Sequence, residues 1–195
     1  MQFKISGKDP VTKVLWPEES VYKATGGFTL DKTNLKDGTD FLEKGSLMAV
    51  DFTTRSAKLV KTAKVHADAA VEAKQYPVKK KHHFKVGDIL AKNKGGAAYA
   101  ITEIITSNAD YDLLVLGTTI GAVTAGDVLF QSSATGADAA AEANVANSIL
   151  IHDTSLEEYT TVNVGLQIFE IIESNLPYAV TSYNKESLTS RFLFV

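Results

Sequence analysis

The sequence predicts a mainly β protein: a small antiparallel β-barrel or sandwich-like module with an extended N-terminal arm and at most short helices. One observation is that short apolar, β-branched runs alternate with turn clusters between Phe84 and Phe130, as successive antiparallel strands do. Another is that Gly-Asp-Ile-Leu at 87–90 returns as Gly-Asp-Val-Leu at 126–129, with Gly45-Ser-Leu-Met as a looser third copy. In the two Gly-Asp copies, glycine permits a sharp turn, aspartate can bond nearby backbone N–H groups, and the apolar pair starts a strand. A meander this short buries one face only by closing or by packing.

The first segment, residues 1–27, reads as an extended arm. The residues before Pro10 and Pro17 are pushed out of the helical conformation, and Gly26-Gly27 then breaks the chain. We expect this arm to be ordered only against a partner or a neighbouring subunit.

Trp16 and Tyr22 are the candidate interface residues of the arm. Large aromatic side chains are enriched at the centres of protein interfaces. Trp16 is the only tryptophan, and two interpretations of it stay open: it packs on its own domain, or it anchors an interface.

The remaining residues, 28–195, read as one β-rich domain or as two β-subdomains, 28–83 and 84–195. Residues 28–65 carry short strand-like runs separated by an Asp-Gly turn. Residues 66–83 begin with Ala, Glu, Lys and Gln, which permit one or two helical turns, but an extended connection fits equally well.

The run Lys79-Lys-Lys-His-His is the most basic stretch of the chain. Its simplest interpretation is a solvated loop or an edge strand whose lysines block edge-to-edge pairing. A nucleic-acid or phosphate contact is the alternative, although no aromatic stacking platform accompanies the run. A metal site at His82 and His83 is disfavoured, because neighbouring side chains on a strand point to opposite faces.

The C-terminal part is expected to return to strands. Residues 132–147 are rich in small side chains and read as a short helix or a long surface loop. Strands are expected from Ser148 and again over 160–173, as one long strand or a pair. Residues 184–189 fit one helical turn, and 191–195 fit a last strand tucked into a sheet.

Composition limits the classes of function. The chain has 195 residues, a formal net charge of -3 and no cysteine. The charge gives no general attraction to nucleic acid or to an acidic membrane surface, so neither is an expected partner. The lack of cysteine excludes disulfides, zinc–thiolate sites and cysteine nucleophiles. No apolar run approaches the ~20 residues of a membrane span, and the first residues lack the apolar core of a secretory signal.

No catalytic motif is present, and we expect no enzyme, no cofactor and no metal site. Phosphate-binding loops, nucleophile elbows and metalloprotease motifs are all missing. Of the four histidines only His152, beside Asp153, resembles half of a catalytic pair, and a base needs its orienting carboxylate across the fold. Carboxylate pairs occur only as close neighbours in the sequence, which is no evidence of a glycosidase cleft: Asp110 and Asp112, and Glu157 and Glu158.

Three blocks of the sequence resemble head proteins of tailed phages and prophages, of the decoration or head-fibre kind. They are Gly27-Phe-Thr-Leu-Asp through Ala57-Lys-Leu-Val-Lys-Thr-Ala-Lys-Val, Phe84-Lys-Val-Gly-Asp-Ile-Leu through Ala125-Gly-Asp-Val-Leu-Phe, and Asn175-Leu-Pro-Tyr-Ala-Val-Thr through Phe192-Leu-Phe-Val. The resemblance consists of turn glycines and strand starts, so it carries over no site residue. It implies a non-enzymatic virion structural protein, assembled in the bacterial cytoplasm, that binds the major capsid protein and self-associates as a trimer or dimer.

A carbohydrate- or ligand-binding β-module is the alternative function. Such a module needs a concave groove lined by exposed aromatic side chains. The residues that would have to cluster at the surface are Tyr99, Tyr111, Tyr159, Tyr178 and Tyr183.

Overall fold

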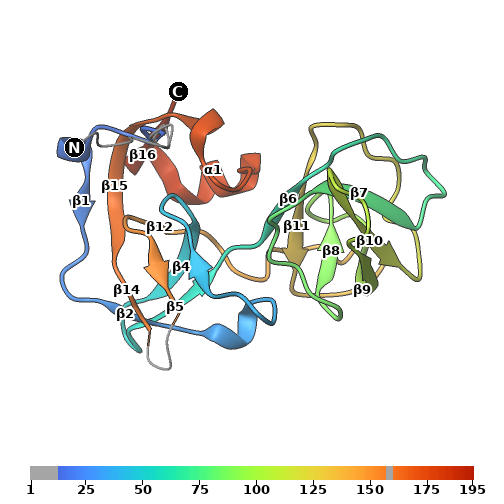
Figure 1. The fold of residues 1–195 in the computed structure, drawn as a ribbon, viewed down its shortest axis with the longest axis horizontal. Helices are drawn as coiled ribbons and strands as arrows, with labels where there is room; N and C mark the ends of the chain where they lie inside the picture. The colour runs from blue at the N-terminus through green and yellow to red at the C-terminus, as the bar shows by residue number, and fades with distance from the viewer. Residues whose placement is uncertain (1–12, 157–159) are drawn as a thin grey trace, which may run out of the picture.

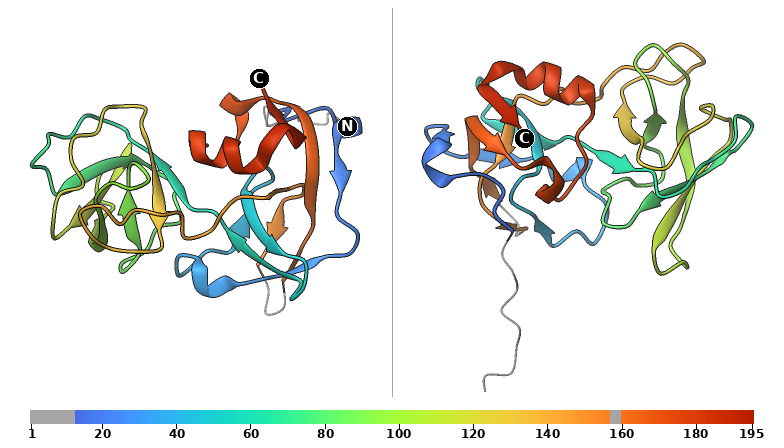
Figure 2. Two further views of the ribbon diagram at one scale, coloured as in Figure 1. Left: turned by 180° about the vertical axis from the view of Figure 1, so that it is seen from behind. Right: turned by 90° about the horizontal axis from the view of Figure 1, so that it is seen from above.

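The computed structural model describes residues 13–156 and 160–195, which form two β-rich units side by side (Figure 1). We call residues 13–60, 146–156 and 160–195 the large unit and residues 61–145 the small unit. Two further views show the same two lobes from behind and from above (Figure 2). The predicted fold class is confirmed, since the described residues contain 16 strands and one short α-helix. Residues 1–12 of the expected arm lie outside the described residues.

The large unit is built on an eight-stranded sheet with the order β1-β15-β12-β4-β5-β2-β14, and β16 also pairs with β15. A two-stranded sheet, β3 with β13, lies beside it. The strands are β1 (Tyr22–Lys23), β2 (Phe28–Leu30), β3 (Phe41–Leu42), β4 (Leu47–Asp51), β5 (Ser56–Leu59), β12 (Ser148–Leu150), β13 (Thr154–Ser155), β14 (Thr161–Val162), β15 (Val164–Ile171) and β16 (Phe192–Phe194).

The helices of the large unit are short. They are η1 (Glu18–Ser20), η2 (Lys32–Asn34), η3 (Glu173–Asn175), α1 (Ser182–Leu188) and η4 (Thr189–Arg191). A capping box starts α1: the Asn184 N–H donates to Thr181 Oγ1 at 3.0 Å, and the Thr181 N–H donates to Asn184 Oδ1 at 3.1 Å. These bonds satisfy orphan donors at the helix start, and they fix α1 where it faces the small unit (Figure 1).

The small unit is a curled six-stranded sheet with the order β6-β11-β8-β9-β10-β7. Its edge strands meet at a single antiparallel bridge, Val65 with Val78, where the His66 N–H donates to the Pro77 carbonyl at 2.8 Å. One bridge does not close the sheet into a barrel, so of the two expected forms, barrel or sandwich-like module, the closed barrel is not the one formed. The strands are β6 (Thr62–Lys64), β7 (Gln75–Lys79), β8 (Ile89–Ala91), β9 (Ala98–Ile105), β10 (Tyr111–Leu116) and β11 (Val128–Ser132).

The two Gly-Asp turns have the geometry that the repeat predicts. Gly87 and Gly126 adopt φ values of 93° and 98°, which favour glycine. The carboxylate of Asp88 accepts the Lys85 N–H at 2.9 Å, and the carboxylate of Asp127 accepts the Thr124 N–H at 2.8 Å. Strands β8 and β11 start directly after these turns and pair with each other.

The sheets divide the chain at other points than the expected 83/84 boundary. Strand β7 pairs with β10, so residues before 84 belong to the same sheet as those after it. The sheet of the large unit contains strands that precede the small unit in the sequence and strands that follow it, since β4 pairs with both β5 and β12. The small unit is therefore an insertion in the large one. Residues 66–74 and 133–147 form turns and connections instead of helices.

Candidate functional site

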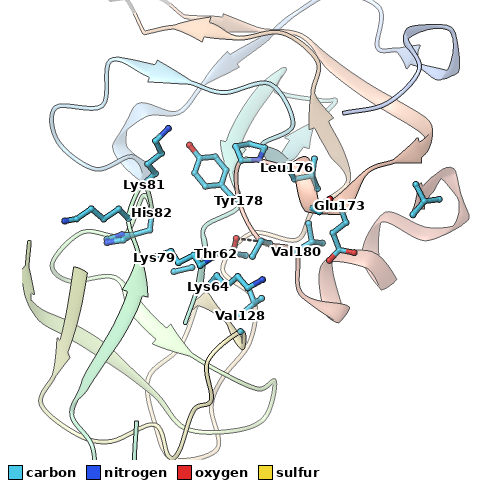
Figure 3. Close-up of a pocket in the computed structure, with 17 residues that line it drawn as sticks. Thr62, Lys64, Lys79, Lys81, His82, Val128, Glu173, Leu176, Tyr178 and Val180 are labelled. Carbon is cyan, nitrogen blue, oxygen red and sulfur yellow. Dashed lines mark hydrogen bonds between the residues drawn. The ribbon is translucent and has the colours of Figure 1, made fainter. Parts of the chain in front are cut away.

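A cleft of about 790 Å³ lies between the two units (Figure 3). The small unit supplies a basic wall and the large unit supplies a mostly apolar one. The lining residues are Thr62, Ala63, Lys64, Lys79, Lys80, Lys81, His82, Gly126, Val128, Glu173, Ser174, Leu176, Pro177, Tyr178, Ala179, Val180 and Val195. Clefts of this volume lie within the usual range of ligand-binding sites, ~300–1,000 Å³.

The basic wall comes from the run of three lysines and two histidines. Lys80 donates to Asp112 on β10 at 2.7 Å, and Lys81 lies 3.3 Å from the Glu43 carboxylate of the large unit. Strand β7 ends at Lys79, and Lys81 adopts a φ of 68° in the turn that follows, just before His82 and His83. The expectation of a solvated run therefore fits the lysines and is wrong for His82 and His83, which are buried.

His82 packs inside the small unit. Its Nδ1 accepts the Phe84 N–H at 3.2 Å, so the proton of the neutral ring sits on Nε2, which lies 3.3 Å from Asp112 Oδ2. That contact is poorly aligned, and Nε2 has no well-formed hydrogen bond within the described residues. Burial, with help from the positive charge of Lys36, lowers the pKa of His82 to about 4.

His83 points the other way, across the junction. Its Nε2 lies 2.7 Å from the Tyr178 hydroxyl of the large unit. Burial is the main cause that lowers the pKa of His83 to about 4, and burial also raises the pKa of the Tyr178 phenol. The two rings are therefore neutral hydrogen-bonding groups near neutral pH, and they form a strut between the units.

A buried ion pair stands where the chain enters the small unit. Lys61 Nζ lies 2.7 Å from Asp88 Oδ2, and the Lys61 side chain has no exposed surface. Asp88 also accepts the Gln131 side-chain amide at 2.9 Å and the Lys85 N–H at 2.9 Å. Burial lowers the pKa of Lys61, and the hydrogen bond and charge of Asp88 oppose that shift. The pair fixes the connection between β5 and β6.

A second contact between the units forms around α1. The ring of Tyr183 meets Phe130 on β11 edge to face, with centroids 5.8 Å apart. The Asn184 amide donates to Glu142 at 3.0 Å, and Glu142 also pairs with Lys94 at 2.5 Å. Together with the His83–Tyr178 strut, these contacts hold the two walls of the cleft in place.

Three exposed apolar side chains lie on neighbouring strands of the large sheet, β1, β15 and β16, and we call them the apolar strip. It consists of Tyr22, Phe169 and Leu193, which are 65%, 38% and 51% exposed. Tyr22 pairs with Gln167, and Ile168 pairs with Phe192. Because Ile168 and Phe192 are buried, their strand neighbours Phe169 and Leu193 face outward. Since Tyr22 is also exposed, a partner can reach it.

Trp16 is in a different situation from Tyr22. It is 2% exposed in the core of the large unit, beside Leu15, whose carbonyl accepts the Ile172 N–H at 2.8 Å. Trp16 packs on its own unit and is not available as an interface anchor. The described part of the arm is accordingly folded into the sheet, because Leu15 and Trp16 bury apolar surface there.

The remaining sequence candidates do not converge. His152 is exposed, and its neighbour Asp153 accepts the Lys44 N–H at 2.6 Å. Asp112 is committed to Lys80. Among the described tyrosines of the proposed aromatic cluster, Tyr111 stacks on His66, and Tyr178 and Tyr183 lie at the junction of the two units. Tyr99 on β9 instead packs against the core of the small unit. Tyr159, Glu157 and Glu158 lie outside the described residues.

The charged side chains that line the cleft are four lysines and Glu173. Within the described residues, no group of three or more metal-ligating side chains is placed to hold an ion. None of the helices in residues 13–156 and 160–195 combines the length and the apolar character that a bilayer crossing requires.

Comparisons with protein-family models, curated proteins and solved structures find no match to this chain.

Proposed function

We propose that this chain is a non-enzymatic structural protein of the tailed-phage head decoration or head-fibre kind. In this role it self-associates, as a dimer or trimer, and binds the major capsid protein on the surface of the virion. The resemblance of its turn and strand-start blocks to such proteins motivates the proposal. The observation that carries it is the exposed apolar strip of Tyr22, Phe169 and Leu193 on adjacent strands.

The strip has the chemistry of an adhesive surface. Contiguous apolar side chains on a folded protein often mark interaction sites, because water is released when a partner covers them. Aromatic side chains such as Tyr22 and Phe169 bury large areas at little cost in conformational freedom. The strip lies on a paired sheet, so its shape is fixed before binding.

Repetition on a shell compensates for a modest contact area. When many copies sit on a symmetric surface and also touch one another, each weak contact is multiplied by avidity. The contacts at His83–Tyr178 and around α1 support this role, because they hold the two units at a fixed distance from each other. A protein that repeats on a symmetric surface needs such a fixed shape.

Light scattering tests self-association directly. We expect the wild-type protein to form a dimer or trimer that a Tyr22→Ser, Phe169→Ser double variant converts to monomer. Val86→Ser is the matched control, since Val86 is an exposed apolar residue of the small unit, outside the strip. A wild-type protein that stays monomeric at all concentrations would contradict the proposal.

Attachment is tested by co-sedimentation with shells assembled from tailed-phage major capsid protein. We expect the wild-type protein and the Val86→Ser variant to sediment with the shells, and the double variant to remain in the supernatant. Equal sedimentation of all three proteins would show that the strip is not part of the surface that attaches to the shell.

A further inference from the structure

Lys64 and Lys79 lie directly opposite each other at the rim of the cleft. The antiparallel bridge between Val65 and Val78 sets this register. Val65 and Val78 are buried, so the two lysines project from the other face, where both are exposed. Side chains in directly opposed positions have Cβ atoms about 5 Å apart.

These two ammonium groups differ from the other lysines of the same wall. Lys80 is paired with Asp112 and Lys81 with Glu43. Lys64 and Lys79 have no ion-pair partner in residues 13–156 and 160–195. Directly opposed like charges repel each other, and a negatively charged group placed between them would relieve that repulsion.

The facing wall offers a different kind of contact. Leu176, Pro177 and Val180 of the large unit line it (Figure 3). The acidic side chain on this wall, Glu173, is already paired with Lys185 at 2.5 Å. The cleft therefore presents two lysines without an ion-pair partner among the described residues on one side. On the other side it presents apolar side chains together with Glu173, Ser174 and Tyr178.

The apolar side chains of the facing wall favour a carboxylate-bearing peptide over inorganic phosphate, because phosphate has no apolar surface to bury on them. No arginine occurs among the described residues that line the cleft, and the planar fork of arginine makes the bidentate contacts typical of phosphate recognition. Lysine supplies a point charge that a Glu or Asp side chain can approach from several directions. Apolar side chains of the same peptide would pack on Leu176 and Val180.

We propose that the cleft binds an acidic, partly apolar peptide segment of the protein that this chain attaches to. The proposal rests on the proposed function in one respect, that the partner is a protein. The carboxylates of the segment lie between Lys64 and Lys79, and its apolar side chains lie on the large-unit wall. The apolar strip and the cleft would then be two separate contacts of the same structural protein.

Fluorescence anisotropy with a short fluorescein-labelled peptide that alternates Glu with Val and Leu tests this. We expect saturable binding that weakens as salt is added, because exposed charges are screened. The Lys64→Gln, Lys79→Gln double variant should bind at least about tenfold more weakly. Lys74→Gln is the matched control, since Lys74 is an exposed lysine of the small unit outside the cleft, and it should bind like the wild type.

Competing ligands provide the opposing outcomes. A peptide with Gln in place of Glu should not bind, and inorganic phosphate should compete only as other salts do. Selective competition by phosphate, or tighter binding of a single-stranded oligonucleotide, would overturn the peptide assignment. So would a double variant that binds like the wild type while its thermal melting shows it to be folded.

The two proposals fail separately. The lysine substitutions leave the apolar strip intact, so self-association measured by light scattering should be unchanged in the double variant. Self-association without peptide binding would reject the cleft proposal alone, whereas peptide binding by a protein that never associates would reject the proposed self-assembly.

Discussion

The imidazole of His83 and the hydroxyl of Tyr178 meet at 2.7 Å across the junction between the small and the large unit. Tyr178→Phe removes the hydroxyl and leaves a buried ring nitrogen without its partner. We expect the free energy of unfolding to fall by about 1–3 kcal/mol, measured by urea denaturation. Tyr99→Phe is the matched control, since no hydrogen bond to its hydroxyl occurs within the described residues. Equal effects of the two changes would show that the strut contributes nothing.

Acid should destabilise the protein before its carboxylates protonate. The pKa values of His82 and His83 are lowered to about 4 in the folded protein, against ~6.5 in an unfolded chain. Between these values the unfolded state binds more protons, so stability falls as pH falls from about 6.5 to about 4. The loss is on the order of 3 kcal/mol for each histidine at most, followed by urea denaturation across this range.

Substitution of one histidine checks that assignment. His83→Gln should flatten the dependence of stability on pH in this window, because one of the two groups no longer gains a proton on unfolding. The exposed His152→Gln is the comparison, and it should retain the wild-type slope. A His83→Gln curve as steep as the wild-type curve would contradict the prediction.

The two Gly-Asp turns allow a buried and an exposed ion pair to be compared in one local geometry. Asp88→Asn leaves the fully buried Lys61 without a carboxylate, and we expect a loss of about 3–5 kcal/mol in the free energy of unfolding. Asp127→Asn breaks the partly exposed pair with Lys92 and should cost less than about 1 kcal/mol. Chemical denaturation of both variants gives the difference, and similar losses would mean that burial is unimportant here.

Trp16 and Tyr22 should separate stability from association. Trp16→Ala removes a side chain from the core of the large unit and should lower the free energy of unfolding by about 3–5 kcal/mol. Tyr22→Ala should change it by less than about 0.5 kcal/mol but weaken self-association in light scattering. If Trp16→Ala weakened self-association and left the free energy of unfolding unchanged, Trp16 would be an interface residue instead of a core residue.

Local features of the fold could be predicted from the sequence. The Gly-Asp turns depend on residues next to each other, so Gly87 with Asp88 and Gly126 with Asp127 are recognisable as strand starts. The β-branched runs predict strands for the same reason. The short helix at the end of the chain also follows from nearby residues, since Thr181 and Asn184 cap each other.

The site could not be predicted, because its partners are distant in the sequence. Nothing near Lys61 indicates that its charge is matched by Asp88, and nothing near His83 indicates Tyr178. Trp16 stands in a proline-flanked segment with no periodic pattern, and its burial depends on strands that come much later. An aspartate in a turn can also stay exposed, as Asp127 partly does, so the repeat alone does not reveal which copy is buried.

The insertion of the small unit has a consequence for the order of folding. Leu59 and Ser148 both pair with Met48, so the chain must return to within about 10 Å of where it left the large sheet. A long disordered loop would oppose that return through the entropy of closing it. Strands β6 to β11 are contiguous in the chain and emerge from the ribosome before β12. Once they have folded, they hold the chain close to Leu59 at the point where Ser148 follows. Folding of the small unit during synthesis thus lowers the entropic cost of adding the later strands to the sheet of the large unit.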